Sequence, residues 1–293
     1  MFNGLVGKTA GVAPVSAADF AALARSSPWR WTALRFTARW PGDAWRAQEL
    51  RAWLRRPDRL RVETVDGALV QVVHESPRQL SVLTSDGNRY SATLPWWTAP
   101  HAPPPPLRAD GLVAARPDRF AYDFAFDAPM YRDYFWVAML DPVELADGRG
   151  PDADATLPGT EIDAITVVDH AGRPAWEAIL GPTPAYEPRC TCCSLLRSRE
   201  VDLAEAAAGA GDKVVLDEYP YAYRVRLDVG TGVCVLTEPI GGSTPGSGHE
   251  LRIEAVDEPM ADDLFQSPPP EPPRSWWSPA PERLPPQPAT DST

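Results

Sequence analysis

Residues 221–240, YAYRVRLDVGTGVCVLTEPI, decide the fold class of this chain. Two runs rich in β-branched and apolar residues, at 223–227 and 233–237, have the alternating character of strands that bury one face. They flank Asp228-Val229-Gly230-Thr231-Gly232, whose glycines favour a tight reversal of the chain. The stretch therefore predicts a β-hairpin.

Weaker copies of this pattern occur outward from that hairpin. The flanking runs are 60–64 with 69–73, 79–84 with 90–94, and 162–169 with 175–180. The first two pairs are separated by Asp66-Gly67 and Asp86-Gly87, dipeptides favoured in short hairpin turns. Further strands are predicted at 29–40 and 250–255. We therefore predict an α+β fold that is mainly antiparallel β, arranged as a meander of hairpins.

Helical signals are fewer than strand signals. Ser16 precedes an apolar-periodic run that ends near residue 26, which predicts a capped amphipathic helix. Leu50, Trp53 and Leu54 have helical spacing and predict a short helix over 47–54. Helices are also predicted at 127–140, with Asp127 as a candidate N-cap, and at 201–208. Residues 147–159 read as a polar loop.

Proline content divides the chain. The sequence has 34 prolines in 293 residues, and they cluster at 98–110 and in the C-terminal tail. We expect a flexible N-terminus at 1–15, a single α+β domain at 16–266 with a proline-rich loop at 98–110, and a disordered tail at 267–293. Trp276-Trp277 in the tail could form a recognition segment, although a passive extension explains its composition more simply.

The net charge and the hydropathy of the chain limit which classes of partner it can bind. The net charge is −12, which argues against nucleic acid because no basic stripe is present to neutralise phosphates. No apolar run is long enough for a membrane span. No basic segment precedes an apolar core at the N-terminus, so we read no secretory signal and expect a cytoplasmic protein.

The motif that most suggests a chemical role is Cys190-Thr191-Cys192-Cys193, and the fourth cysteine, Cys234, lies elsewhere in the chain. Thiolates at Cys190, Cys192 and Cys193 could bind zinc, with His170 or His249 as a fourth ligand. The C-x-C-C spacing is not the paired C-x2-C of zinc knuckles, and adjacent cysteines rarely reach one metal. The simpler interpretation is that these cysteines are buried or turn residues without a chemical role, and a redox role is a third alternative. We expect no cofactor, with zinc as the alternative.

Other catalytic patterns are absent from the sequence. It contains no Gly-x-Ser-x-Gly elbow and no His-Glu-x-x-His, and its four histidines are scattered. We expect the turn histidines His170 and His249 to be solvated. No carboxylate lies in an apolar stretch that would raise its pKa, and helix capping with a solvated face accounts for Asp133 and Glu144. We predict no catalytic residues.

Aromatic residues are spread over strands and helices that would face one another. They could simply form a core. The alternative is an apolar ligand cavity between a sheet and its covering helices. The cavity residues would be Trp31, Phe36, Trp53, Trp96, Trp97, Tyr134, Trp136 and Trp176.

The order of these elements resembles the lipoprotein-carrier superfamily, which includes periplasmic lipoprotein carriers, LppX-type lipoproteins and the N-terminal domain of RseB-type regulators. The resemblance is carried by the N-terminal helix, the strand at 29–40, the segment WLRRPDRLRVE at 53–63 leading to a hairpin, and the ending at 259–265. It implies a curved, unclosed barrel or half-barrel with helices on its concave face and an apolar cavity. The cysteine segment and proline tail have no counterpart in it.

These observations support three functions. The first is a non-catalytic binding protein that holds an apolar or lipid-like ligand between sheet and helices. The second is a protein-interaction or regulatory module with a protein partner. The third is a cysteine- or zinc-dependent enzyme. Fold alone does not decide among them, since one fold serves many functions.

Overall fold

The computed structural model describes residues 14–42, 48–75, 79–83, 89–93, 105–116, 129–150, 156–207 and 215–267. Its helices are α1 (Ala17–Ser26), α3 (Tyr134–Leu140) and α4 (Arg199–Ala207). Its strands are β1 (Ala33–Arg39), β2 (Leu50–Arg55), β3 (Arg59–Thr64), β4 (Leu69–His74), β5 (Gln79–Leu83), β6 (Arg89–Thr93), β7 (Asp147–Arg149), β8 (Thr156–Pro158), β9 (Thr160–His170), β10 (Arg173–Pro182), β11 (Ala222–Asp228), β12 (Cys234–Ile240) and β13 (His249–Val256). Short 3₁₀ turns lie at Ser27–Trp29, Val143–Leu145, Thr191–Cys193 and Asp262–Phe265.

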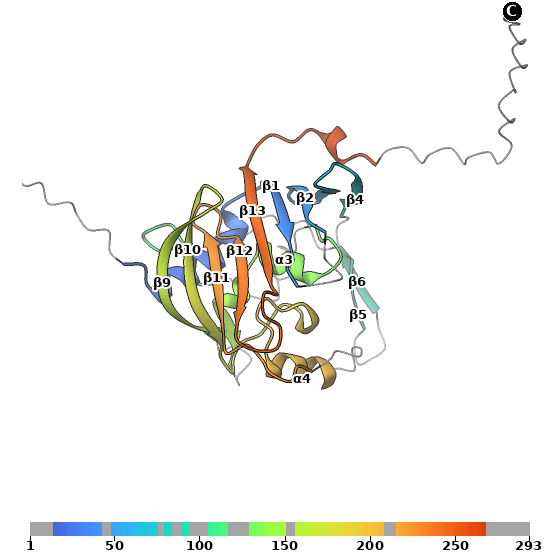
Figure 1. Cartoon of the computed structure of the whole chain (residues 1–293). Coiled ribbons are helices and arrows are strands. Elements are labelled where there is room, and N and C mark those ends of the chain that lie inside the picture. The colour runs from blue at the N-terminus through green and yellow to red at the C-terminus, as the bar shows by residue number, and fades with distance from the viewer. Residues whose placement is uncertain are drawn as a thin grey trace, which may run out of the picture.

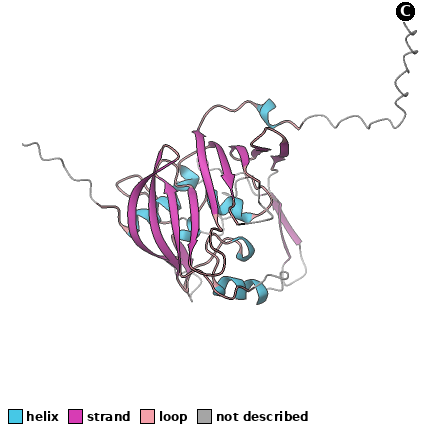
Figure 2. Ribbon diagram, in the orientation of Figure 1, coloured by secondary structure: helices cyan, strands magenta, loops and turns pink. Residues whose placement is uncertain are grey.

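One nine-stranded sheet dominates the fold, in the order β4-β3-β2-β1-β13-β12-β11-β10-β9. Every pairing in it is antiparallel. An N-terminal meander, β1 to β4, and a C-terminal meander, β9 to β13, meet where β1 pairs with β13 (Figure 1). The sheet is unclosed, and Figure 2 shows its strands curving around the helices. The predicted fold class is confirmed.

The predicted hairpins are also confirmed. β11 and β12 form the hairpin at 221–240, and Gly232 in its turn has a φ of +75°. A Cβ at Gly232 would lie 2.7 Å from the carbonyl oxygen of Leu23 on α1, so glycine there serves both the turn and helix packing. The other three hairpins are β3–β4, β5–β6 and β9–β10.

Residues 47–54 were expected to form a helix, and that prediction is wrong where the structure describes them. They lead into strand β2, where Leu50, Ala52 and Leu54 are buried and the residues between them are half-buried. The period is therefore two. Leu50, Trp53 and Leu54 fit helical spacing only because half-buried Trp53 is apolar.

Two other expectations need correction. Residues 147–159 were expected to form a polar loop, but they contain the short paired strands β7 and β8. The strand expected at 29–40 begins only at Ala33, because Pro28 lies at the start of the 3₁₀ turn Ser27–Trp29.

Capping side chains set the helix starts. Ser16 caps α1 in a capping box with Asp19, as the sequence predicts. α3 begins at Tyr134 because Asp133 accepts a hydrogen bond from the backbone N–H of Phe135. Asp127, the predicted cap, lies outside the described residues, as do the other predictions at Trp96, Trp97, residues 1–13 and residues 268–293, including Trp276-Trp277.

The core lies between the sheet and two helices. α1 packs against β9 and β11, and α3 packs against β12. α4 lies at the end of the sheet and contacts the 3₁₀ turn at Thr191–Cys193 (Figure 1). In the part of the chain that the structure describes, every helix is too short or too polar to cross a bilayer.

Candidate functional site

An aromatic cluster lies between α3 and strand β1. The ring of Trp136 on α3 is 5.3 Å from that of Phe36, 6.2 Å from that of Trp40 and 5.5 Å from that of Tyr131, centroid to centroid. All four residues are buried in the main hydrophobic core. We call Phe36, Trp40, Tyr131 and Trp136 the aromatic cluster.

In the part of the chain that the structure describes, the indole Nε1 of Trp136 and the hydroxyl of Tyr131 have no hydrogen-bond partner. Their residues are only 1% and 4% exposed. Buried N–H and O–H groups are nearly always paired, because leaving one unpaired costs about 1–3 kcal/mol. Two unpaired donors on neighbouring rings can be satisfied by a ligand with a hydrogen-bond acceptor.

The structure places the predicted cavity residues in three groups. Trp31, Phe36 and Trp136 are buried core residues, whereas Trp53, Tyr134 and Trp176 are half-buried. Trp96 and Trp97 lie outside the described residues. The structure therefore brings Phe36 and Trp136 together, and it adds Trp40 and Tyr131, which were not among the predicted cavity residues.

Trp31 has a packing role. Its indole N–H donates to the Ser27 hydroxyl at 3.1 Å, and the guanidinium of Arg56 lies 3.4 Å above its ring. The Nη1 group of Arg56 donates to the carbonyls of Pro28 and Trp31. Burial lowers the pKa of Arg56 to about 9. The cation thus covers Trp31 and fixes the chain that enters β1.

A second buried polar region follows α3 directly. Asp141, the last cap of α3, is 1% exposed and accepts hydrogen bonds from Arg116 and from Arg189, the latter at 2.6 Å. Burial acts to raise the pKa of this carboxyl, but the two guanidinium groups outweigh it and hold the pKa below its usual range. The interaction joins three segments that are distant in sequence.

Glu144 is the other buried carboxylate, although the sequence led us to expect it on a solvated face. It accepts hydrogen bonds from the Tyr186 hydroxyl at 2.5 Å, the Leu195 N–H at 2.8 Å and the Arg189 N–H at 3.2 Å. Burial raises its pKa above the usual range, against the lowering effect of these hydrogen bonds. We call Asp141, Glu144, Tyr186 and Arg189 the carboxylate region.

The sequence signal for the carboxylate region was present but local. Asp141 follows the apolar helix YFWVAML at 134–140, and Glu144 lies between Val143 and Leu145. A carboxylate among apolar neighbours is a candidate for burial.

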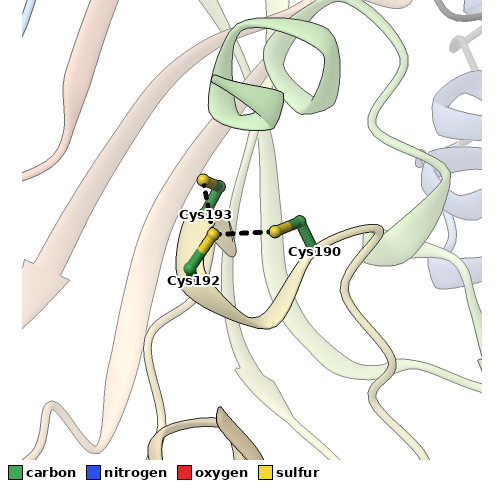
Figure 3. A group of neighbouring side chains, drawn as sticks. All are labelled: Cys190, Cys192 and Cys193. Carbon is green, nitrogen blue, oxygen red and sulfur yellow. Dashed lines mark hydrogen bonds between the residues drawn. The ribbon is translucent and has the colours of Figure 1, made fainter. Parts of the chain in front are cut away.

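Three thiols gather at the 3₁₀ turn Thr191–Cys193. The Sγ atoms of Cys190 and Cys192 are 2.8 Å apart, and those of Cys192 and Cys193 are 3.1 Å apart (Figure 3). All three sulfurs lie within 4.8 Å of one another. The sequence led us to expect that adjacent Cys192 and Cys193 rarely both reach one metal. In the structure the turn, closed by a hydrogen bond from Cys193 N to the Cys190 carbonyl, places the three sulfurs close together. We call these residues the thiol cluster.

Cys234 does not belong to the thiol cluster. It is fully buried in the hydrophobic core on β12, and its thiol donates to the carbonyl of Leu236. Burial raises the pKa of the Cys234 thiol. It is therefore a scaffold residue, as expected.

The turn histidines are buried, contrary to expectation, and neither joins the thiol cluster. His249 Nε2 donates to the Cys234 carbonyl, so Nδ1 accepts from the Thr237 hydroxyl, both at 2.8 Å. His170 Nε2 donates to the Leu251 carbonyl at 2.9 Å. Both rings tie strands together, which removes them as metal ligands.

Comparison with known proteins assigns this chain to no family. No protein-family model matches this chain, and no curated protein matches it. One solved structure to which it is similar is described as "Crystal structure of MucB", with 14% sequence identity, a TM-score of 0.35 and coverage of 86% of this chain. The chain spans 62% of the length of that chain. Membership of the lipoprotein-carrier superfamily stays a prediction.

Proposed function

We propose that this protein is a non-catalytic binding protein that holds an apolar, lipid-like ligand carrying a hydrogen-bond acceptor against the aromatic cluster. The observation that carries the proposal is the pair of unpaired donors, Trp136 Nε1 and the Tyr131 hydroxyl, in an apolar environment. Ligand sites of this kind are mostly apolar with a few polar groups that fix orientation.

The chemistry of the cluster defines the ligand. The aromatic rings favour an acyl chain or another apolar body, and the two donors favour an ester, carboxyl or amide oxygen. The guanidinium of Arg132 lies 5.0 Å from the centre of the Tyr131 ring, so both a neutral and a negatively charged acceptor are compatible with the cluster. Because both donors are buried, a ligand reaches them only when the chain that covers them opens locally.

The test measures ligand uptake and compares matched tyrosines. The delipidated protein is titrated with a fluorescent fatty acid and, separately, with its methyl ester, and protein from cells is weighed by native mass spectrometry. Tyr131→Phe and Trp136→Phe should each weaken binding roughly three- to tenfold, the value of one hydrogen bond. Tyr223→Phe is the control, because the Tyr223 hydroxyl is already paired with the Arg197 carbonyl at 2.7 Å.

The proposal fails if wild-type protein takes up neither probe and carries no lipid from cells. It also fails if Tyr131→Phe and Trp136→Phe bind as tightly as wild type. If only the charged fatty acid binds, and equally in all variants, the site lies elsewhere on the protein.

A second candidate function rests on strand β9. β9 pairs with β10 on one side, and no described strand pairs with its other side. Its exposed positions include Glu161, Asp163 and Asp169, and Val167 is 64% exposed. An open strand edge can add an extended segment of a partner through backbone hydrogen bonds, and the acidic side chains favour a basic segment.

This alternative is tested by charge reversal. A Lys- and Arg-rich peptide of extended conformation should bind wild type with an affinity that falls as salt rises. The triple variant Glu161→Lys, Asp163→Lys, Asp169→Lys should lose that binding. Equal binding by the triple variant removes β9 as the contact, and lipid uptake should be unaffected by these changes.

A further inference from the structure

We propose that the thiol cluster, Cys190, Cys192 and Cys193, is a zinc site with three thiolate ligands and a fourth position open to solvent. The proposal is independent of lipid binding. It rests on the position of the three sulfurs and on the way their segment is held.

The three sulfurs are close enough together to share one ion. Zinc lies about 2.3 Å from each thiolate, so tetrahedral coordination places the sulfurs about 3.8 Å apart. Two pairs here are closer than that, at 2.8 and 3.1 Å, and all three sulfurs lie within 4.8 Å. Zinc binding therefore requires the two close pairs to move apart. Three soft thiolates select zinc or a similar thiophilic ion over magnesium or calcium.

The segment that carries the thiols is fixed at both ends. Before the cluster, the Arg189 N–H donates to Glu144 and its guanidinium to Asp141. After it, the Leu195 N–H donates to the same Glu144 carboxylate. Within the turn, the Thr191 hydroxyl donates to Glu205 of α4. Glu144 therefore holds the two ends of the segment together, so binding an ion costs little ordering of the chain.

The exposure of the thiols is also suitable. Cys192 is exposed, Cys190 is half-buried and Cys193 is buried, so an ion can approach from solvent and bind against the protein interior. Neither histidine can supply the fourth ligand, because both rings are engaged between strands. An open fourth position is the arrangement of zinc sites that bind water or an added ligand.

The experiment uses the full chain, reduced and freed of metal. Zinc is added against a chromophoric chelator, and Co²⁺ serves as a spectroscopic probe for thiolate coordination. One zinc per chain is expected, together with sulfur-to-cobalt charge-transfer absorption and a higher Tm in zinc. The double variant Cys190→Ser, Cys192→Ser changes only the exposed and half-buried ligands, which keeps the buried side intact.

Cys234→Ala is the matched control, because it removes a cysteine outside the cluster. It should bind zinc like wild type, whereas the double variant should bind at least about tenfold more weakly, since even residues that only orient ligands cost that much. Zinc binding well below one per chain in reduced wild type overturns the proposal. Equal affinity in the double variant overturns it too. If the reduced protein does not bind zinc and the air-oxidised protein contains a disulfide within the thiol cluster, the thiols form a redox pair instead.

Discussion

Two buried polar regions lie at opposite ends of α3, and they differ in how their polar atoms are paired. Before and within the helix, Tyr131 and Trp136 each leave a donor without a partner. After it, Asp141 and Glu144 each accept hydrogen bonds from several groups. Carboxylate oxygens that are paired in a low-dielectric interior stabilise one packing of the chain, whereas an unpaired buried donor can be satisfied by an added acceptor. We therefore interpret the Asp141 and Glu144 carboxylates as part of the scaffold and the aromatic cluster as the candidate ligand site.

The largest effect is expected at Asp141. Asp141→Asn removes the carboxylate that pairs with Arg116 and Arg189, leaving their buried charges without its compensation. Breaking a buried ion pair from one side costs about 3–5 kcal/mol of unfolding free energy. Urea denaturation followed by tryptophan fluorescence measures this loss.

Asp262→Asn is the control for Asp141. Asp262 also pairs with an arginine, Arg55, but its side chain is 86% exposed. Its replacement should change the urea midpoint little. Equal losses in the two variants would contradict the contrast between buried and exposed pairs.

A pair of tyrosines tests the comparison most directly. Tyr186→Phe removes a hydrogen bond to the buried Glu144 carboxylate, which should cost roughly 1.5–3 kcal/mol. Tyr131→Phe removes a hydroxyl that has no partner, so the ligand-free protein should be unchanged or slightly more stable. Chemical denaturation of both delipidated variants gives the two values, and a clear loss in Tyr131→Phe would show that its hydroxyl is paired in solution.

A surface cap provides a smaller reference. Ser16→Ala removes the capping box of α1 and should cost about 1 kcal/mol. Hydrogen bonds from the Ser16 backbone and from Arg108 lower the pKa of Asp19 to about 2 from 3.8. The stability that Asp19 supplies is therefore present above pH 3.8 and is lost as the pH falls toward 2. Thermal unfolding of wild type and Asp19→Asn between pH 2 and 5 should converge as the pH falls, because wild type loses the charge that the variant lacks.

The smallest expected effect is on how the free energy of unfolding depends on pH when Glu144 is replaced. Because its pKa is raised in the folded state, the protonated carboxyl is the form that folding favours. Its contribution is fully present below pH 4.5, the ordinary value, and is lost as the pH rises through the folded pKa. Glu144→Gln cannot ionise, so the stability difference between variant and wild type should shift in favour of the variant as the pH rises from 4. A difference that is flat with pH would contradict the raised pKa.

Local sequence signals predicted the hairpins but not the order of the sheet. Asp66-Gly67 and the turn at 228–232 are read from a few neighbouring residues, and both reverse the chain as expected. The pairing of β1 with β13 depends on side chains more than 200 positions apart, for which no turn signal exists. Strand β2 was misread because Trp53, half-buried between Arg51 and Arg55, supplied a false helical period.

The sequence predicted which types of residue form the candidate site, but not which of them contact one another. Aromatic residues were expected to gather, and Phe36 and Trp136 do so. Which of them leave donors unpaired depends on the packing of α3, so Tyr131 could not be selected from sequence. The thiol cluster was visible as a motif, but its convergence depends on the 3₁₀ turn that the sequence did not predict.

The pairing of β1 with β13 also sets the order in which the molecule can be completed during synthesis. β1 is synthesised early. One of its two neighbours in the sheet is β13, which ends at Val256, near the end of the described chain. While the ribosome is still making the intervening residues, the N-terminal meander has an unpaired edge at β1, a surface that can pair with another chain. That edge is covered only after β13 has left the ribosome and paired with β1. A polypeptide that stops before His249 therefore keeps that edge exposed and should be prone to aggregation.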